Sequence, residues 1–258
     1  FDMHDPLISI LLPTHNRAGI LGSAIQSVLE QSFENWELII LDDASTDETH
    51  AIVEEFMRGD KRIRYEPSLE NLRLVKTLNR GLGLARGTYI ARIDDDDTWS
   101  DCDKLKKQVG FLEENPQCVL VGTGFMAMRS NGTCAYEFHP PKKDVDIRKV
   151  FLLYNPFGHS TVVFLREFAL KLGGYDVSLG YTEDYDLWLR MGCYGSLANL
   201  SDSTVKYALG EGMSSSNRRN HFRYHLRLLR EYGNKYPGKY YAYFRLIASH
   251  ALRILRLR

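Results

Sequence analysis

The chain has 258 residues, 44% of them hydrophobic and 26% charged, which allows one large domain or a domain with an appendage. No run of 18 apolar residues occurs, so we expect no transmembrane helix, and the first residues lack the basic and apolar regions of a signal peptide. The four cysteines are scattered without a C-x-x-C pair, which predicts a reduced, cytoplasmic setting and argues against a zinc site.

The charge of the chain is zero overall but uneven along it. Residues 214–258 contain eleven lysines and arginines and one acid, Glu231, so this segment carries a charge of +10. Residues 1–213 therefore carry −10. The asymmetry predicts a basic surface element attached to an acidic body.

The first half of the chain alternates short apolar runs with helical patterns. We expect strands over 7–12, 36–41, 63–65 and 89–93, and helices over 20–31, 48–57, 71–84 and after Ser100. Ser45 or Thr46 is expected to cap the second helix, and Ser100 the fourth, with Asp103 in place of a capping-box Glu. Elements at this spacing predict right-handed βαβ units and a mostly parallel sheet.

The second half has a different pattern. A strand is expected over 119–128, with Asn131-Gly132 as a turn that pairs 135–138 back onto it. Beyond it the patterns predict a helix over 145–153, a strand over 160–165, and helices over 167–172 and 182–191. Thr182 is placed to cap the last helix. Acids in its first turn, such as Glu183 and Asp184, are favoured by the helix dipole alone.

Carboxylates gather where two of the predicted strands end. Asp94 to Asp97 follow the strand at 89–93, and Asp42 and Asp43 follow the strand at 36–41. We expect these strands to be neighbours whose carboxyl ends face one crevice. Four adjacent like charges repel one another, and a hard cation such as Mg²⁺ or Mn²⁺ would offset the repulsion. A solvated acidic loop is the alternative. No G-x-G-x-x-G or P-loop pattern occurs.

From residue 217 the pattern is helical, with a break near Tyr236-Pro237-Gly238, and the segment is basic, aromatic and amphipathic. Two interpretations stay open. The helices lie on an anionic membrane surface, or they form a hairpin packed on the domain with solvated arginines. No known nucleic-acid reading motif occurs, so no nucleic-acid partner is expected.

Five ordered motifs give the chain a resemblance to a known family. They are Leu11-Leu12-Pro13-Thr14-His15-Asn16-Arg17, the DDxSxD pattern at Asp42 to Asp47, Asn79-Arg80-Gly81-Leu82 with Ala85-Arg86-Gly87, the D-x-D-D pattern at Asp94 to Asp97, and Glu183-Asp184. Together they resemble the family 2 inverting glycosyltransferases. The resemblance implies the GT-A fold, a Rossmann-like α/β fold with a mostly parallel central sheet flanked by helices. It implies a GT-A domain over 1–215, with a nucleotide-sugar half at about 7–118 and an acceptor half at 119–215. The basic amphipathic segment at 216–258 then forms a C-terminal helical extension.

The resemblance also implies roles for individual residues. Asp184 would be the general base that takes the proton from the acceptor hydroxyl as its oxygen attacks and inverts the anomeric carbon. Asp96 would be the best direct ligand of Mg²⁺ or Mn²⁺ at the diphosphate, with Asp94 and Asp97 as further ligands. The nucleotide-sugar site would be formed by Pro13, Thr14, Asn16, Arg17, Asp42, Asp43, Lys76, Asp94 and Asp95.

The implied activity is metal-dependent transfer from a nucleotide-diphospho-sugar, with a UDP-sugar as the expected donor, to a saccharide or lipid-linked saccharide acceptor. The expected context is bacterial surface glycan synthesis, in the cytoplasm and at the inner face of the cell membrane. The Q-x-x-R-W motif of processive synthases is absent, so single addition is expected.

The chain departs from the family at Leu209, where a His that contacts metal or phosphate is usual. Either the metal is held with diphosphate and water alone, or Glu211 or a basic tail residue assists. Three rival interpretations are a nucleotidyltransferase, a receiver-like or phosphatase-like domain, and a non-catalytic homologue that binds nucleotide-sugars.

Overall fold

Apolar runs of the first half form strands that are buried on both faces. All seven residues of β1 (Ile8–Thr14) and all seven of β2 (Trp36–Asp42) are buried. Alternate side chains of β1 enter two separate core clusters, with Ile10 in one and Leu11 in the other. Such double burial requires helices on both sides of the sheet.

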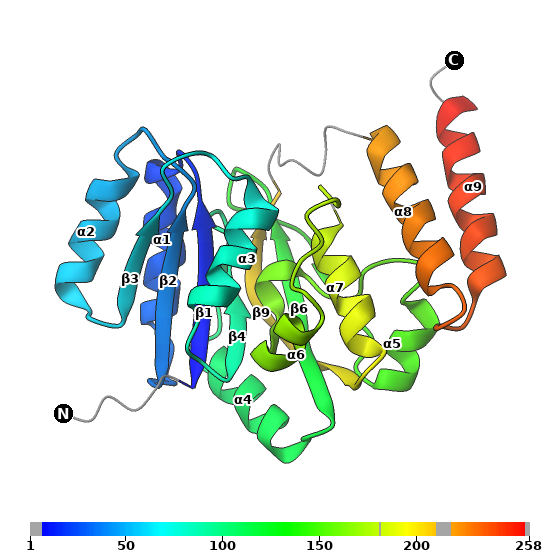
Figure 1. Cartoon of the computed structure of the whole chain (residues 1–258), viewed down its shortest axis with the longest axis horizontal. Coiled ribbons are helices and arrows are strands. Elements are labelled where there is room, and N and C mark those ends of the chain that lie inside the picture. Colours follow the sequence, from blue (N-terminus) through cyan, green and yellow to red (C-terminus); the bar gives the residue numbers. More distant parts are fainter. Residues whose placement is uncertain (1–6, 181, 210–217, 256–258) are drawn as a thin grey trace.

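A computed structural model describes residues 7–180, 182–209 and 218–255, with backbone alone for residues 218–221 and 251–255 (Figure 1). The remaining elements are α1 (Ala18–Leu29), α2 (Thr49–Gly59), β3 (Ile63–Pro67), α3 (Leu74–Leu84), β4 (Tyr89–Arg92), β5 (Thr98–Trp99), α4 (Lys104–Glu114), β6 (Cys118–Met128), β7 (Cys134–Phe138), α5 (Asp144–Val150), a 3₁₀ turn (His159–Thr161), β8 (Val163–Leu165), α6 (Arg166–Lys171), α7 (Glu183–Gly192), β9 (Ser196–Ala208), α8 (Arg218–Tyr232) and α9 (Lys239–Leu255).

One sheet runs through the molecule in the order β3-β2-β1-β4-β8-β6-β9-β5, with β7 paired to β6. Strands β3, β2, β1 and β4 are parallel, and β8 joins β4 and β6 antiparallel. The core cluster on one face includes side chains of α1, α2 and α4, and the cluster on the other face includes side chains of α3, α5, α6, α7 and α8. The predicted α/β class with flanking helices is confirmed.

The order of the strands corrects the expected position of the two acidic strand ends. Strands β2 and β4 are not neighbours, because β1 lies between them. Thr14 at the end of β1 is level with Asp42 of β2, and Leu11 is level with Arg92 at the end of β4. The polar segment after β1 therefore occupies the middle of this edge of the sheet, between the two groups of carboxylates.

Several predicted helix starts are wrong, because nearby side chains or strands use the same backbone groups. Helix α2 begins at Thr49, whose N–H donates to Asp47 at 3.1 Å, so neither Ser45 nor Thr46 is the cap. Ser100 is not a cap either, because its N–H donates to the Thr204 carbonyl at 2.8 Å and α4 begins four residues later.

Thr182 does stand at the N-cap position of α7, yet its side chain makes no capping hydrogen bond. Two strands were not expected from the apolar pattern. Strand β5 has only two residues, and β9 contains the polar run Ser201-Asp202-Ser203 in its middle.

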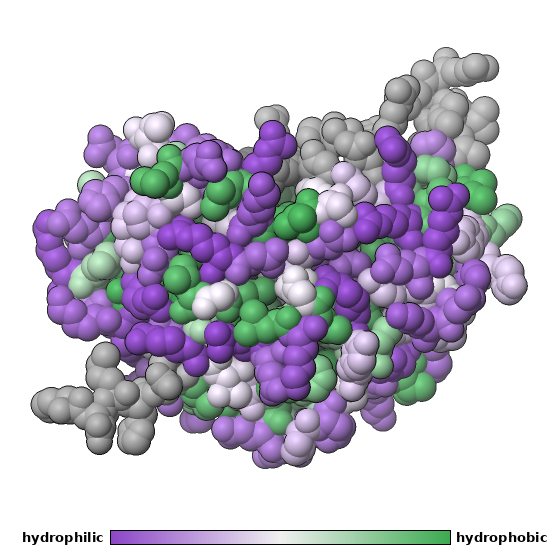
Figure 2. Space-filling view, viewed as in Figure 1, coloured by the Kyte–Doolittle hydropathy of each residue, from purple (hydrophilic) through white to green (hydrophobic). Residues whose placement is uncertain are grey.

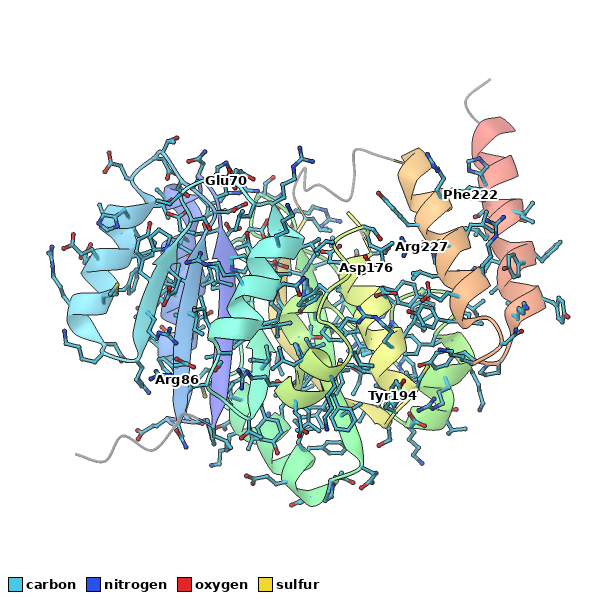
Figure 3. All side chains as sticks on the ribbon, viewed as in Figure 1. Glu70, Arg86, Asp176, Tyr194, Phe222 and Arg227 are labelled. Carbon is cyan, nitrogen blue, oxygen red and sulfur yellow. The ribbon has the colours of Figure 1, made fainter. Side chains whose placement is uncertain are left out.

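The C-terminal helices are attached to the domain through α8. Leu228, Leu229 and Tyr232 are buried in the same core cluster as Trp188 of α7. Arg227 of α8 and Asp176 of the loop before α7 point toward each other and form an ion pair at 2.8 Å (Figure 3). The two helices therefore form a hairpin in which α8 packs on the domain and α9 is the outermost helix, packed on α8 (Figure 1). Within the described residues, no helix combines the length and apolarity needed to cross a bilayer.

Candidate active site

A buried arginine underlies the carboxylate loop that follows β4. The Arg92 side chain is fully buried, and its Nη1 donates to the Leu11 carbonyl at 3.2 Å and the Ile93 carbonyl at 2.6 Å. Its Nη2 donates to Asp94 Oδ1 at 2.5 Å, and its Nε donates to His159 Nε2 at 3.3 Å. Burial alone would raise the pKa of Asp94, but the charge of Arg92 and the hydrogen bonds from Arg92 and Ser160 together lower it.

The next two carboxylates experience an excess of negative charge. Burial raises the pKa of Asp95 to about 6, and the charges of Asp94 and Asp96 add to this effect. Burial and the charge of Asp94 raise the pKa of Asp96 in the same direction. The positive charge of Arg17 acts against both shifts, so the segment after β1 contributes a cation to this group.

Asp97 points into the protein. It is 1% exposed. Its Oδ2 accepts from Ser160 Oγ at 2.5 Å, and its Oδ1 accepts from the N–H of Ala208 at 3.0 Å. Ser160 Oγ also accepts from the N–H of Asp94 at 2.9 Å. Asp97 therefore ties the carboxylate loop to the 3₁₀ turn before β8 and to the end of β9.

The acidic residues after β2 organise the loops around them. Both oxygens of Asp43 accept backbone N–H groups, from Leu72 at 2.7 Å and from Arg73 at 2.8 Å. Arg73 has a φ of +67°, so this carboxylate stabilises an unfavourable backbone conformation before α3. The predicted helix over 71–84 consequently begins only at Leu74.

Asp42 and Asn16 have similar positioning contacts. Asp42 Oδ1 accepts from the N–H of Ser45 at 2.9 Å, and its Oδ2 accepts from the hydroxyl of Tyr65. Asn16 has a φ of +54°, and its Oδ1 accepts from the N–H of Thr46 at 2.7 Å. The loops after β1 and β2 are thus joined to each other.

The other predicted nucleotide residues have different exposure. Pro13 and Thr14 are buried at the end of β1, whereas Arg17 and Lys76 are exposed. No described interaction joins Lys76 to the carboxylates. Its approach to the diphosphate stays a prediction.

Asp184 stands in the first turn of α7, opposite the carboxylate loop. Its Oδ2 accepts from Asn155 Nδ2 at 2.9 Å. Burial raises the pKa of Asp184 to about 6, and the charge of Asp94 adds to the shift. Burial and the charge of Asp184 raise the pKa of Glu183 to about 8. With a pKa of about 6, the Asp184 carboxylate is a stronger base than an ordinary aspartate and is still mostly charged at neutral pH, whereas Glu183 is mostly protonated.

The donor set fits a hard divalent cation with few protein ligands. All of its donors are carboxylate oxygens, and the raised pKa of Asp96 shows charge that a cation would neutralise. No choice of one oxygen each from Asp94, Asp96 and Asp97 puts all three oxygens within 4.8 Å of one another. Among the described residues, only Asp101, Cys102 and Asp103 have three ligand atoms that close together. The geometry suits an ion held by one or two carboxylates and by phosphate oxygens.

At the position where the family usually has a metal- or phosphate-contacting His, this chain offers no metal ligand. Leu209 is 37% exposed, and its N–H donates to the Met128 carbonyl at 2.8 Å. His159 lies near the site, but burial and Arg92 lower its pKa to about 3, and its Nε2 faces inward. Glu211 lies outside the described residues.

Four residues near the site were not predicted from the sequence: Arg92, Asn155, Ser160 and Tyr207. Arg92 could have been identified from the sequence, because a cation between Ala91 and Ile93 interrupts an otherwise apolar strand. Asn155 and Ser160 contact Asp184 and Asp97, which lie 29 and 63 residues away in the sequence, so local patterns do not reveal them. Burial and the charges of Asp97 and Asp94 raise the pKa of Tyr207, which places this ring beside the cluster.

Two cavities in the described part of the chain lie apart from the predicted site residues. A hollow of about 390 Å³ is lined by Phe111, Lys142 and Asn199, among others. A second, of about 610 Å³, includes Trp99 and Lys206. Neither contains a predicted site residue.

Comparison with known families identifies the chain. The profile described as Glycosyl transferase family 2 matches residues 9–171, so the chain belongs to this family and the predicted membership is confirmed. An uncharacterized glycosyltransferase of Haemophilus influenzae is 31% identical over 227 residues, which cover 82% of this chain and 68% of the relative. The amylovoran biosynthesis glycosyltransferase AmsE of Erwinia amylovora is 29% identical, covering 82% of this chain and 80% of AmsE.

Solved structures show the same fold. The mannosyltransferase PcManGT from Pyrobaculum calidifontis, in complex with GDP-Man and Mn²⁺, matches with a TM-score of 0.71 and 19% identity over 95% of this chain and 70% of PcManGT. S. aureus TarS 1–349, in complex with UDP-GlcNAc, matches with a TM-score of 0.70 and 20% identity over 86% of this chain and 64% of TarS 1–349. The GT-A fold is confirmed. The chain spans 54% to 68% of the length of three curated relatives.

Proposed function

We propose that the protein is a metal-dependent, inverting glycosyltransferase that uses a nucleotide-diphospho-sugar. The observation that carries the proposal is the meeting of two carboxylate groups from distant parts of the chain. Asp94 to Asp96 follow β4, and Asp184 stands at the start of α7, close enough for the charge of Asp94 to raise the pKa of Asp184. The first group could hold a metal ion at the donor diphosphate, and Asp184 could take the proton of the acceptor hydroxyl.

In the proposed reaction, the acceptor oxygen attacks the anomeric carbon as the bond from that carbon to the diphosphate breaks. Asp184 takes the proton of the acceptor hydroxyl, and Asn155 orients this carboxylate. The leaving diphosphate keeps the electron pair of the broken bond. A bound Mg²⁺ or Mn²⁺ would supply Lewis-acid stabilisation of that charge, with Asp96 as the first ligand and Asp94 beside it.

The nucleotide would lie along the loops after β1 and β2. Thr14, Asn16, Asp42 and Asp43 belong to these loops or to the strand ends that lead into them. Because Asp43 binds two backbone N–H groups, we propose that it shapes the nucleoside pocket as well as lining it. Pro13, Arg17, Lys76 and Asp95 complete the proposed donor site.

The donor and acceptor are proposed from the relatives. The related structures hold UDP-GlcNAc and GDP-Man, and we favour a UDP-sugar. The name of AmsE places it in amylovoran biosynthesis, which supports a saccharide or lipid-linked saccharide acceptor in surface glycan synthesis. The absence of the Q-x-x-R-W motif favours single addition. A lipid-linked acceptor would place the enzyme at a membrane, beside which the basic segment 214–258 would be favourable.

The test is release of nucleoside diphosphate from UDP-, GDP- and dTDP-sugars with Mn²⁺ and a panel of saccharide acceptors. Asp184→Asn is expected to lower the rate by about 10²- to 10⁴-fold while nucleotide binding persists. Asp202→Asn, which changes an exposed carboxylate on β9, serves as the matched control. Equal rates for wild type and Asp184→Asn would overturn the assignment of the base. Donor binding without release would favour the non-catalytic homologue. Formation of pyrophosphate from a nucleoside triphosphate and a sugar 1-phosphate would favour a nucleotidyltransferase.

A further inference from the structure

The outermost helix exposes a stripe of large apolar side chains. Twelve such side chains of the described residues are exposed, and four of them lie on α9. Tyr240, Phe244 and Ile247 are 84%, 69% and 57% exposed, and their spacing places them on one face of the helix. Tyr241 beside them is 60% exposed. Figure 2 shows hydrophobic side chains along the edge of the molecule over this helix.

The opposite face of α9 is already in use. Ala242 is buried, and Tyr243 and Leu246 pack against the core cluster that includes α8. His250 stacks on Phe222 of α8 with ring centroids 4.2 Å apart. Helix α9 is therefore held by one face, and its apolar outer face has no further layer over it in Figure 1. Contiguous exposed apolar surface of this kind marks a binding face.

We propose that the outer face of α9 docks on a phospholipid surface that contains anionic lipids. The net charge of the C-terminal segment favours a lipid surface over a second copy of the chain as the partner of this face. Residues 214–258 carry +10 in a chain of zero net charge, and Arg223, Arg230, Lys235 and Arg245 are exposed on α8, on α9 or between them. A second copy docked symmetrically through α9 would bring two +10 segments together, whereas an anionic surface attracts one.

The chemistry of the stripe agrees with this occupant. Tyrosine is favoured at the boundary between lipid and water, where its ring is buried and its hydroxyl stays wet. Phe244 and Ile247 would enter the acyl boundary, as in amphipathic helices that lie in the membrane plane. The structure thus narrows the membrane element from the whole segment after residue 217 to one face of α9, because α8 is committed to the protein core.

This inference deepens the proposed function, which it uses only to explain why a lipid surface would be useful. Helix α8 alone separates α9 from α7, the helix that begins with Glu183-Asp184 (Figure 1). Docking through α9 would hold the site near a lipid-linked acceptor. Vesicle binding and sugar transfer can be measured separately, so the failure of one is distinguishable from the failure of the other.

The test is flotation of the full chain with two kinds of vesicles, phosphatidylcholine alone and phosphatidylcholine mixed with phosphatidylglycerol. We expect binding to the mixed vesicles that weakens as salt is added. A triple variant, Tyr240→Ser, Phe244→Ser and Ile247→Ser, is expected to lose at least about tenfold in binding, because it removes three apolar side chains from the lipid boundary.

The matched control changes three exposed apolar residues elsewhere, Tyr194→Ser, Val145→Ser and Leu170→Ser, which are 69%, 58% and 43% exposed. This control should bind as wild type does, and a cooperative thermal melt of every variant would show that each is folded. Absence of wild-type binding, or equal loss in both triple variants, would overturn the proposal. Sedimentation that shows the α9 variant converting a dimer to a monomer, with vesicle binding unchanged, would assign the face to a second copy.

Discussion

At the scale of single residues, Arg92 and His159 place a fixed positive charge beneath Asp94. His159 Nε2 lies 3.3 Å from the donor Nε of Arg92, so this nitrogen accepts and the ring proton sits on Nδ1. The neutral ring agrees with the lowered pKa of His159. Arg92 thus remains a single charge balanced mainly by Asp94, and its two carbonyl contacts prevent it from moving.

The two ends of the carboxylate loop have different partners, and this difference predicts different effects of neutral substitutions. Asp96→Asn should weaken Mn²⁺-dependent UDP binding at least about tenfold, since it removes a charged oxygen from the proposed ion site. Asp97→Asn should change that binding by less than about threefold but lower thermal stability, because one oxygen that contacts Ser160 Oγ or the Ala208 N–H becomes an NH₂ group, and a buried polar group left without its partner costs about 1–3 kcal/mol.

Calorimetric titration and thermal unfolding separate these effects. The two variants have the same chemistry and lie next to each other, so each is the control for the other. If Asp97→Asn lost metal-dependent binding and Asp96→Asn kept it, Asp97 would be the direct ligand in place of Asp96.

Lys104 predicts a pH dependence of stability that is independent of the site. It is fully buried on α4, with Nζ 2.8 Å from Gln108 Oε1 and 4.2 Å from the centroid of the Trp99 ring. Burial lowers the pKa of Lys104 to about 7, from 10.5. Above pH 7, Lys104 is therefore protonated in a larger fraction of the unfolded chains than of the folded chains. The free energy of unfolding should rise with pH up to about 10, by about 1.4 kcal/mol per unit at most.

Lys104→Met keeps the length of the side chain and removes this titration. The variant should be the more stable form near pH 7, and its advantage should shrink as the pH rises. Urea unfolding of both proteins between neutral pH and about pH 10 measures the difference. Parallel stability profiles would show that Lys104 keeps an ordinary pKa in the folded protein.

At the scale of elements, α7 is held on the side away from the sheet by α8. Tyr232 of α8 donates to Asp186 Oδ1 at 2.8 Å, and Arg190 Nε donates to Oδ2 of the same carboxylate at 2.8 Å. Arg227 pairs with Asp176 at the start of the loop that leads into α7 (Figure 3). The helix that carries Asp184 therefore has its first turn fixed by contacts from outside residues 1–215.

Helix α3 offers a matched pair of glycines with opposite surroundings. A Cβ on Gly81 would lie 2.5 Å from a methyl carbon of Leu41, whereas a Cβ on Gly83 would meet nothing within 4 Å. Gly83→Ala should stabilise the protein by about 0.5–1 kcal/mol, since alanine is the better helix former. Gly81→Ala should destabilise it by about 1–3 kcal/mol through overpacking against the strand β2.

Both variants can be compared by urea unfolding at one pH. The same substitution in the same helix controls for intrinsic propensity, so the difference between the two variants reports on packing alone. Equal stabilities would mean that Leu41 moves aside without cost.

At the scale of the whole molecule, the sequence predicts most of the first half of the sheet and less of the second. Strands β1 and β2 are continuous apolar runs, and burial on both faces explains why their pattern is so clear. Strand β9 mixes apolar with polar residues, because its middle segment is exposed. Two-residue β5 exists only through its pairing with β9, which is more than a hundred residues away.

The candidate site divides in the same way. Runs of acids and their positions after strands predict the edge of the sheet that carries them, because strand direction decides where a strand end lies. They do not predict that β1 separates the two groups. Their contacts depend on tertiary structure. Asp97 turns inward because Ser160 and the N–H of Ala208 lie there, and neither is near it in the sequence. The role of Asp43 in shaping the loop at Arg73 is hidden for the same reason.

Truncation from the C-terminus tests how far the helical extension belongs to the domain. Ending the chain after Gly238 removes α9, whose core contribution is Ala242 and the partly buried Tyr243 and Leu246. This variant should stay folded, with a loss of about 2–4 kcal/mol. Ending it after residue 217 also removes four buried side chains, Leu228, Leu229, Tyr232 and Tyr236.

These four side chains should add about 6–12 kcal/mol to the loss from α9, at about 1.5–3 kcal/mol for each buried side chain. The cost equals most of the stability of a typical domain, about 5–15 kcal/mol, and the longer deletion uncovers the face of α7 that holds Asp186. We therefore expect the variant ending at 217 to aggregate and the variant ending at 238 to unfold cooperatively in a thermal melt. A soluble, cooperatively unfolding protein ending at 217, with donor binding intact, would instead establish 1–215 as an independent domain.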